Sequence, residues 1–193
     1  GYLLVAFAAA PVLGISAAMF YLAAYAATNV GAFAVVSHFA NAGERYVTLE
    51  DYEGLGRSSP LLAATLTIFL LSLIGIPMTG GFFAKFYVFS AAVKTNLIWL
   101  TIVGVVNSGV GAYYYLRIIV VMYMREVRKE VPIAPVPFAL RAGLVCCVAV
   151  TLYLGIFPDR LLRFAQDSAR ELVQNPRPGT PSSEPLSALH ELP

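Results

Sequence analysis

The fold of this chain is decided by residues 71–87, which read LSLIGIPMTGGFFAKFY. The stretch contains four residues that disfavour a continuous helix: Gly75, Pro77, Gly80 and Gly81. Proline removes a backbone donor and clashes with the preceding turn, and glycine adopts dihedral angles that other residues avoid. The stretch therefore predicts a helix that is interrupted near residues 75–81.

The apolar run around this break, residues 60–93, has the wrong length for straight membrane helices. Its 34 residues would form a rod of roughly 50 Å at about 1.5 Å per residue, against a hydrocarbon core of about 30 Å. Two complete spans would be too short and would lack a charged loop between them. One span that is broken in its middle fits this length best.

Lys85 is the only charged side chain between residues 60 and 93. A lone ammonium at membrane depth is costly, so such a residue is a candidate functional site. Burial and the positive end of the second half-helix both disfavour the charged form. We therefore expect Lys85 to alternate between charged and neutral forms and to exchange protons. The structural alternative is a lysine that reaches the lipid interface or neutralises an acid on a partner.

The composition indicates an integral membrane protein. Hydrophobic residues make up 59% of the 193 residues and charged residues 12%, whereas soluble domains are about 25% charged. The net charge of +2 is too small to suggest a nucleic-acid partner. Cys146 and Cys147 are adjacent, which is not the spacing of metal ligands. Because phosphate-binding, haem and iron–sulfur motifs are also absent, we expect this chain to bind no metal and no cofactor.

The hydropathy pattern predicts an all-α polytopic membrane protein. Five spans are expected, at residues 1–14, 16–39, 60–93, 97–124 and 138–157. The first begins as if already within a helix, so we interpret the chain as part of a longer protein. A short surface helix is expected to begin at Thr48 and to end near Gly54 or Gly56. An amphipathic interfacial helix is expected at residues 159–174, followed by a disordered tail at 175–193.

Several polar side chains on the spans are candidate steps of a proton path. They are His38, Ser72, Thr79, Tyr87, Asn107 and Tyr114. Thr28 and Ser108 belong to the same set of polar residues within the spans. The structural alternative for each is strong, because serine and threonine in membrane helices most often bond their own backbone or a neighbouring helix.

Residues 71–87 closely resemble the broken-helix signature of the subunit N family of bacterial NADH-quinone oxidoreductase, respiratory complex I. Four further segments resemble the same family in the same order: residues 20–25, 29–33, 51–56 and 112–117. The resemblance covers about residues 1–158. Related antiporter-like subunits usually carry a glutamate directly after the lysine, where this chain has Phe86.

The resemblance implies the second repeat of an antiporter-like fold in the membrane arm of complex I. Such a subunit translocates protons across the bacterial plasma membrane, with Lys85 in the exit half of the path. It is a non-redox part of the enzyme: other subunits of the hetero-oligomer carry FMN and iron–sulfur clusters, oxidise NADH and reduce quinone. This chain would hold one half-channel and would not pump alone. Two alternatives remain: a subunit of a multi-subunit cation/proton antiporter without redox activity, and a structural module whose polar residues only pack helices.

Overall fold

The computed structural model describes residues 1–9, 11–40, 48–126 and 135–174, and within these ranges all regular secondary structure is helical. The helices in chain order are α1 (Tyr2–Ala8), α2 (Pro11–Ala40), the 3-10 helix η1 (Leu49–Tyr52), α3 (Leu55–Ser58), α4 (Pro60–Ile74), α5 (Gly80–Lys94), α6 (Ile98–Met124), α7 (Phe138–Ile156) and α8 (Pro158–Gln174). The predicted all-α fold class is confirmed. The predicted tail at 175–193 lies outside the described residues.

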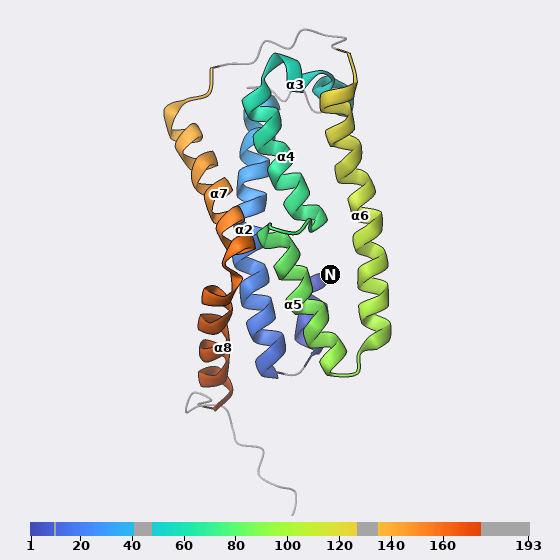
Figure 1. Cartoon of the computed structure of the whole chain (residues 1–193), viewed down its shortest axis with the longest axis vertical. Coiled ribbons are helices and arrows are strands. Elements are labelled where there is room, and N and C mark those ends of the chain that lie inside the picture. The colour runs from blue at the N-terminus through green and yellow to red at the C-terminus, as the bar shows by residue number, and fades with distance from the viewer. Residues whose placement is uncertain (10, 41–47, 127–134, 175–193) are drawn as a thin grey trace, which may run out of the picture.

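Helix α2 is the centre of the bundle. It has 30 residues and is contacted by α1, α4, α5, α7 and α8. Figure 1 shows α6 and α7 on opposite sides, with α6 packed against α4 and α5. Among the described helices, α2, α6 and α7 are each long and apolar enough to cross a membrane.

Helices α4 and α5 lie where the sequence predicts an interrupted span, at residues 60–93, and that they cross a membrane stays a prediction. Each has 15 residues, and they follow one another along α2 (Figure 1). Pro60 occupies the first turn of α4, where its missing N–H costs no hydrogen bond. The predicted helix break is confirmed.

The predicted boundary between the first two spans is misplaced. The sequence placed it at residue 15, whereas α1 ends at Ala8 and α2 begins at Pro11. The proline suits a first helical turn. Gly14 lies inside α2, where a Cβ would collide with the carbonyl of Ala6, so this glycine permits close packing of α1 on α2. A close helix crossing was thus mistaken for a turn.

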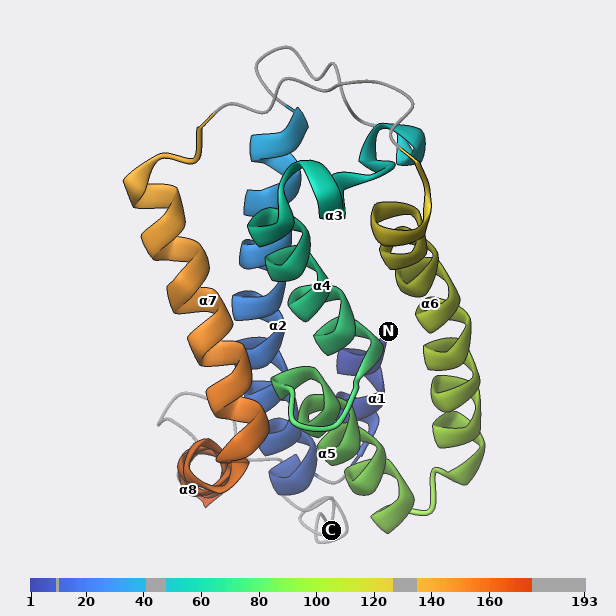
Figure 2. The ribbon, with the colours of Figure 1, turned by 45° about the horizontal axis from the view of Figure 1, so that its top comes forward.

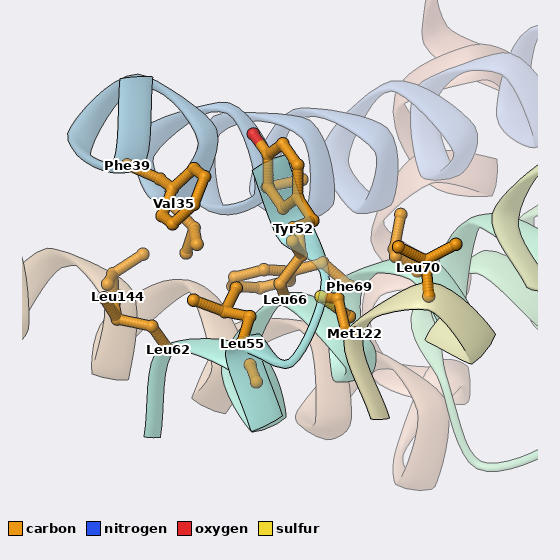
Figure 3. Close-up of a cluster of buried hydrophobic side chains, with 13 residues drawn as sticks. Val35, Phe39, Tyr52, Leu55, Leu62, Leu66, Phe69, Leu70, Met122 and Leu144 are labelled. Atoms are coloured by element: carbon orange, nitrogen blue, oxygen red, sulfur yellow. The ribbon is translucent and has the colours of Figure 1, made fainter. Parts of the chain in front are cut away.

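The short helix predicted before α4 begins after Thr48 as expected, but it ends at Tyr52 and not near Gly54 or Gly56. Gly54, with a φ of 72°, leads into the second short helix, α3. Thr48 starts η1, and its backbone N–H and hydroxyl both donate to the Asp51 carboxylate, at 2.9 and 2.6 Å. Figure 3 shows the apolar cluster that holds this segment, with Tyr52 and Leu55 packed among side chains of α2, α4 and α6. The rings of Phe39 and Tyr52 lie 4.5 Å apart.

Helix α8 begins two residues after α7 ends and changes direction. In Figure 2 it is seen end-on while α7 is seen lengthwise. Ala165 and Ala169 are buried, and α8 packs along α2, whereas Arg163, Arg170 and Glu171 are exposed. The amphipathic helix expected at 159–174 therefore spans residues 158–174, and its interfacial position stays a prediction.

Candidate functional site

The connection between α4 and α5 is a tight turn. Gly75 ends α4 with a φ of 92°, and its N–H and that of Ile76 donate to the Leu71 carbonyl at 3.0 and 3.1 Å. Met78 also has a positive φ, 72°, which is uncommon for a residue with a side chain. The hydroxyl of Thr79 donates to the Ile76 carbonyl at 2.7 Å, so Thr79 stabilises the turn.

Two glycines allow neighbouring backbones to approach this turn. A Cβ at Gly81 would collide with the carbonyl of Ser72, and a Cβ at Gly155 of α7 would collide with the carbonyl of Met78. The end of α4, the start of α5 and the C-terminal end of α7 therefore meet at close range.

Ser72 of α4 connects the two half-helices through a hydrogen bond to the backbone of α5. Its Oγ is fully buried, accepts the Gly81 N–H at 3.1 Å, and lies 3.3 Å from the Thr28 hydroxyl of α2. The Thr28 hydroxyl donates to the Ala24 carbonyl at 2.8 Å. Ser72 thus satisfies one N–H at the start of α5, which has no side-chain cap bond from Thr79.

Lys85 reaches back from α5 to the end of α4. Its Nζ donates to the carbonyls of Leu73 and Ile74 at 2.9 and 3.0 Å and lies 2.7 Å from the Ser108 hydroxyl of α6. The ring of Tyr2 is 5.2 Å from the Nζ, a distance at which a cation is attracted to an aromatic face. Lys85 therefore connects α1, α4, α5 and α6.

These contacts account for the last four carbonyls of α4, which have no partner inside the helix. Those of Leu71 and Ser72 accept backbone N–H groups of the turn, and those of Leu73 and Ile74 accept the Lys85 amine. A buried carbonyl without a donor is costly. Lys85 thus completes the hydrogen bonding of the break.

The electrostatic expectation for Lys85 considered burial and the positive end of α5 but not the end of α4, and was therefore incomplete. The Nζ lies against the C-terminal carbonyls of α4, whose partial negative charge favours the ammonium form. Burial favours the neutral amine. The two effects oppose each other at this position.

A small cavity lies beside Lys85 on the α2 side. Its volume is about 20 Å³, and Tyr21, Tyr25, Thr28 and Ser72 contribute to its lining. A single water needs about 10–15 Å³ and two or more polar partners. The cavity fits one water molecule between Lys85 and α2.

The remaining predicted site residues are separate from Lys85. His38 lies in the last turn of α2, ten residues beyond Thr28 and so about 15 Å along the helix. Tyr87 packs edge-on against Phe20 with 5.1 Å between ring centroids. Asn107 and Tyr114 are exposed on α6. Of the predicted path residues, the structure brings Ser72 and Thr79 to the break.

Several parts of the site could not be singled out from the sequence. Ser108 and Thr28 were only two polar residues among many, because their partners lie on other helices. The acceptors on Leu73 and Ile74 are backbone atoms, which leave no trace in residue type. Gly155 is far from the break in sequence. Within the described ranges, no group of three or more histidine, cysteine, aspartate or glutamate side chains is placed to hold a metal ion.

The family model described as "NADH:quinone oxidoreductase/Mrp antiporter, TM" matches residues 1–111. NADH-quinone oxidoreductase subunit N 2 of Koribacter versatilis is 68% identical over 90% of this chain and 35% of its own length. Subunit N 1 of Solibacter usitatus is 56% identical over 89% of this chain and 36% of its own length. This chain thus spans about a third of the length of the curated relatives it matches.

Two solved structures share the fold. A chain of respiratory complex I from Thermus thermophilus has a TM-score of 0.70 at 31% identity, covering 84% of this chain and 36% of that one. A chain of the Mrp complex from Dietzia sp. has a TM-score of 0.76 at 23% identity, covering 89% of this chain and 40% of that one. On the match of its first 111 residues, this chain belongs to the NADH:quinone oxidoreductase/Mrp antiporter transmembrane family.

Proposed function

We propose that this chain is part of a proton-translocating subunit of NADH-quinone oxidoreductase in the bacterial plasma membrane. The strongest support from relatives is its 68% identity to a protein named as subunit N of that enzyme. The chain takes part in proton movement and not in the redox chemistry. NADH, FMN, the iron–sulfur clusters and quinone are handled by other subunits of the membrane-bound complex.

The observation that carries this proposal is the position of Lys85 at the helix break. Its amine is held by two carbonyls and a hydroxyl between α4, α5 and α6. These three polar contacts are all neutral groups. None of them is a carboxylate that would hold Lys85 in the ammonium form. The α4 carbonyls favour the ammonium form and burial disfavours it. The proposal requires burial to be the larger effect, so that the charged and neutral forms lie closer in free energy than in water.

Lys85 then takes up a proton from one side of the membrane and releases it towards the other. The break provides two carbonyls, of Leu73 and Ile74, that accept hydrogen bonds from the Lys85 amine. In a continuous helix these carbonyls would bond to the backbone N–H groups of the next turn. Ser72, Thr28 and the cavity beside them provide polar groups on the α2 side. His38, Tyr87, Asn107 and Tyr114 remain candidates for more distant steps.

The experiment uses the complete complex in sealed membrane vesicles, with proton movement and quinone reduction both measured. Lys85→Ala is expected to abolish proton translocation by this subunit and to slow coupled quinone reduction at least tenfold. Lys85→Arg keeps a charged donor for the carbonyls but does not lose its proton, so it should assemble well and still fail to pump. Lys94→Ala, at the exposed end of the same helix, is the control and should pump normally. Normal pumping by Lys85→Arg would disprove proton exchange at Lys85.

The second candidate function is cation/proton exchange without a redox partner. The family description includes Mrp antiporters, and the fold matches an Mrp chain. Phe86 argues against it, because the related antiporter-like subunits usually have a glutamate directly after the lysine. Sodium-driven proton movement in vesicles that lack NADH and quinone would favour this alternative.

A further inference from the structure

The three polar partners of the Lys85 amine differ in what they can do. The carbonyls of Leu73 and Ile74 only accept hydrogen bonds, whereas the Ser108 hydroxyl both accepts and donates. The contact with Ser108 is also the shortest of the three, 2.7 Å, against 2.9 and 3.0 Å. Ser108 is thus the one partner of the three that can adapt to a change in the charge of the lysine.

The ammonium and the neutral amine of Lys85 differ in the number of N–H groups that they can donate, and this number determines what Ser108 has to do. A lysine ammonium has three N–H donors, one for each partner. A neutral amine has two N–H donors and one lone pair. If the two hydrogens stay on the carbonyls, the lone pair faces Ser108, and the hydroxyl must turn to donate to it. The carbonyl bonds, and with them the end of α4, then keep their geometry in both forms.

We infer that Ser108 is the proton relay of Lys85 and that the proton enters or leaves the amine on the α6 side. In the release step an N–H bond of Lys85 breaks and an O–H bond of Ser108 forms. At the same time the original O–H bond of Ser108 breaks, and its proton passes to a water molecule beyond it. The products are a neutral amine, an intact serine and a hydronium ion, so one positive charge has moved outward. Uptake is the reverse of this step.

The arrangement of α6 agrees with this direction. Ser108 is half-buried between Lys85 and the outside of α6, and its neighbour Asn107 is exposed there. Figure 1 shows α6 at the edge of the bundle, next to α4 and α5. Polar side chains at membrane depth usually face protein or a water-filled space. A water molecule beside Asn107 would accept the released proton.

The test compares Ser108→Ala with Ser108→Thr in the complete complex. Ser108 acts in this way only if Lys85 exchanges protons as proposed above, so Lys85→Ala is measured in parallel. A relay predicts that alanine lowers the proton-translocation rate by about 10²- to 10⁴-fold, the range for a lost proton-transfer group, and that threonine, which keeps the hydroxyl, retains most of it. A purely packing role predicts the reverse, because alanine fits in the space of serine and the extra methyl of threonine does not.

The pH dependence of the rate provides the second measurement. Removing the hydroxyl costs the ammonium a charge-assisted hydrogen bond, which is stronger than the neutral bond that the amine loses. The alkaline limb of the pH–rate profile of Ser108→Ala should therefore move to lower pH. The other titratable groups near Lys85 in the described residues are phenols from three helices: Tyr2 of α1, Tyr21 and Tyr25 of α2, and Tyr115 of α6, which interacts electrostatically with these three.

The outcomes separate the two proposals. If Lys85→Ala pumps normally, the proposed function fails and the relay fails with it. If Lys85→Ala is inactive while Ser108→Ala keeps both its rate and its pH profile, the relay alone is wrong. If Ser108→Ala does not assemble, Ser108→Cys takes its place, since a thiol of similar size is a poor hydrogen-bonding group. Slow translocation by the cysteine variant supports the relay, and full activity overturns it.

Discussion

Ser72→Ala is the substitution that most directly tests how the two half-helices are joined. It removes the buried oxygen that accepts the Gly81 N–H at 3.1 Å and leaves the backbone of α4 intact. Because a buried donor then has no acceptor, the start of α5 should become less stable by about 1–3 kcal/mol. With a factor of ten for every 1.4 kcal/mol, local opening should become about 5- to 140-fold more frequent.

The measurement is amide hydrogen exchange of residues 80–84 in the assembled complex, with and without the substitution. The control is Thr65→Ala on the same helix, because the Thr65 hydroxyl donates to the Leu61 carbonyl of its own helix at 2.7 Å. Exchange of residues 80–84 should accelerate in Ser72→Ala and stay unchanged in Thr65→Ala. Equal exchange rates of residues 80–84 in both variants would refute the claim that the Ser72 hydrogen bond to Gly81 stabilises the start of α5.

Two further predictions concern packing around the break and along α2. Gly155→Ala should lower the melting temperature of the complex, because its Cβ collides with the Met78 carbonyl and overpacking costs about 1–3 kcal/mol; Gly143→Ala on the same helix has no neighbour within 4 Å and should not. Equal melting temperatures of the two variants would mean that Gly155 of α7 is not closely packed against the backbone of Met78. Ala169→Leu should speed amide exchange throughout α8, because that position is completely buried, whereas Glu171→Leu on an exposed position should leave it unchanged. Protection of α8 that survives Ala169→Leu would contradict its packing on α2.

The parts of the fold that could be predicted are those with local causes. Gly75 and Pro77 disrupt a helix wherever they occur in an apolar run, so the break followed from residue type alone. The start of η1 followed from Thr48 and Asp51, which bond to each other within one turn. Lys85 was identifiable as a candidate because a charge in such a run is rare.

The parts that could not be predicted depend on contacts between distant segments. Gly14 resembled a turn residue in sequence, but it serves a crossing between α1 and α2 that only the packed structure reveals. The hydrogen-bond partners of Lys85 could not be predicted either. They are two main-chain oxygens and a serine from another helix. Residue type carries no information about which backbone atoms a long side chain will reach.

The equal division of the interrupted span has a consequence for how the protein is made. Each piece of 15 residues is only about 22 Å long, short of a hydrocarbon core of about 30 Å. Neither piece is long enough to span the bilayer by itself, so we expect that neither is inserted alone during synthesis. We expect the two pieces to be inserted together and to pack against α2, which precedes them in the chain and contacts both.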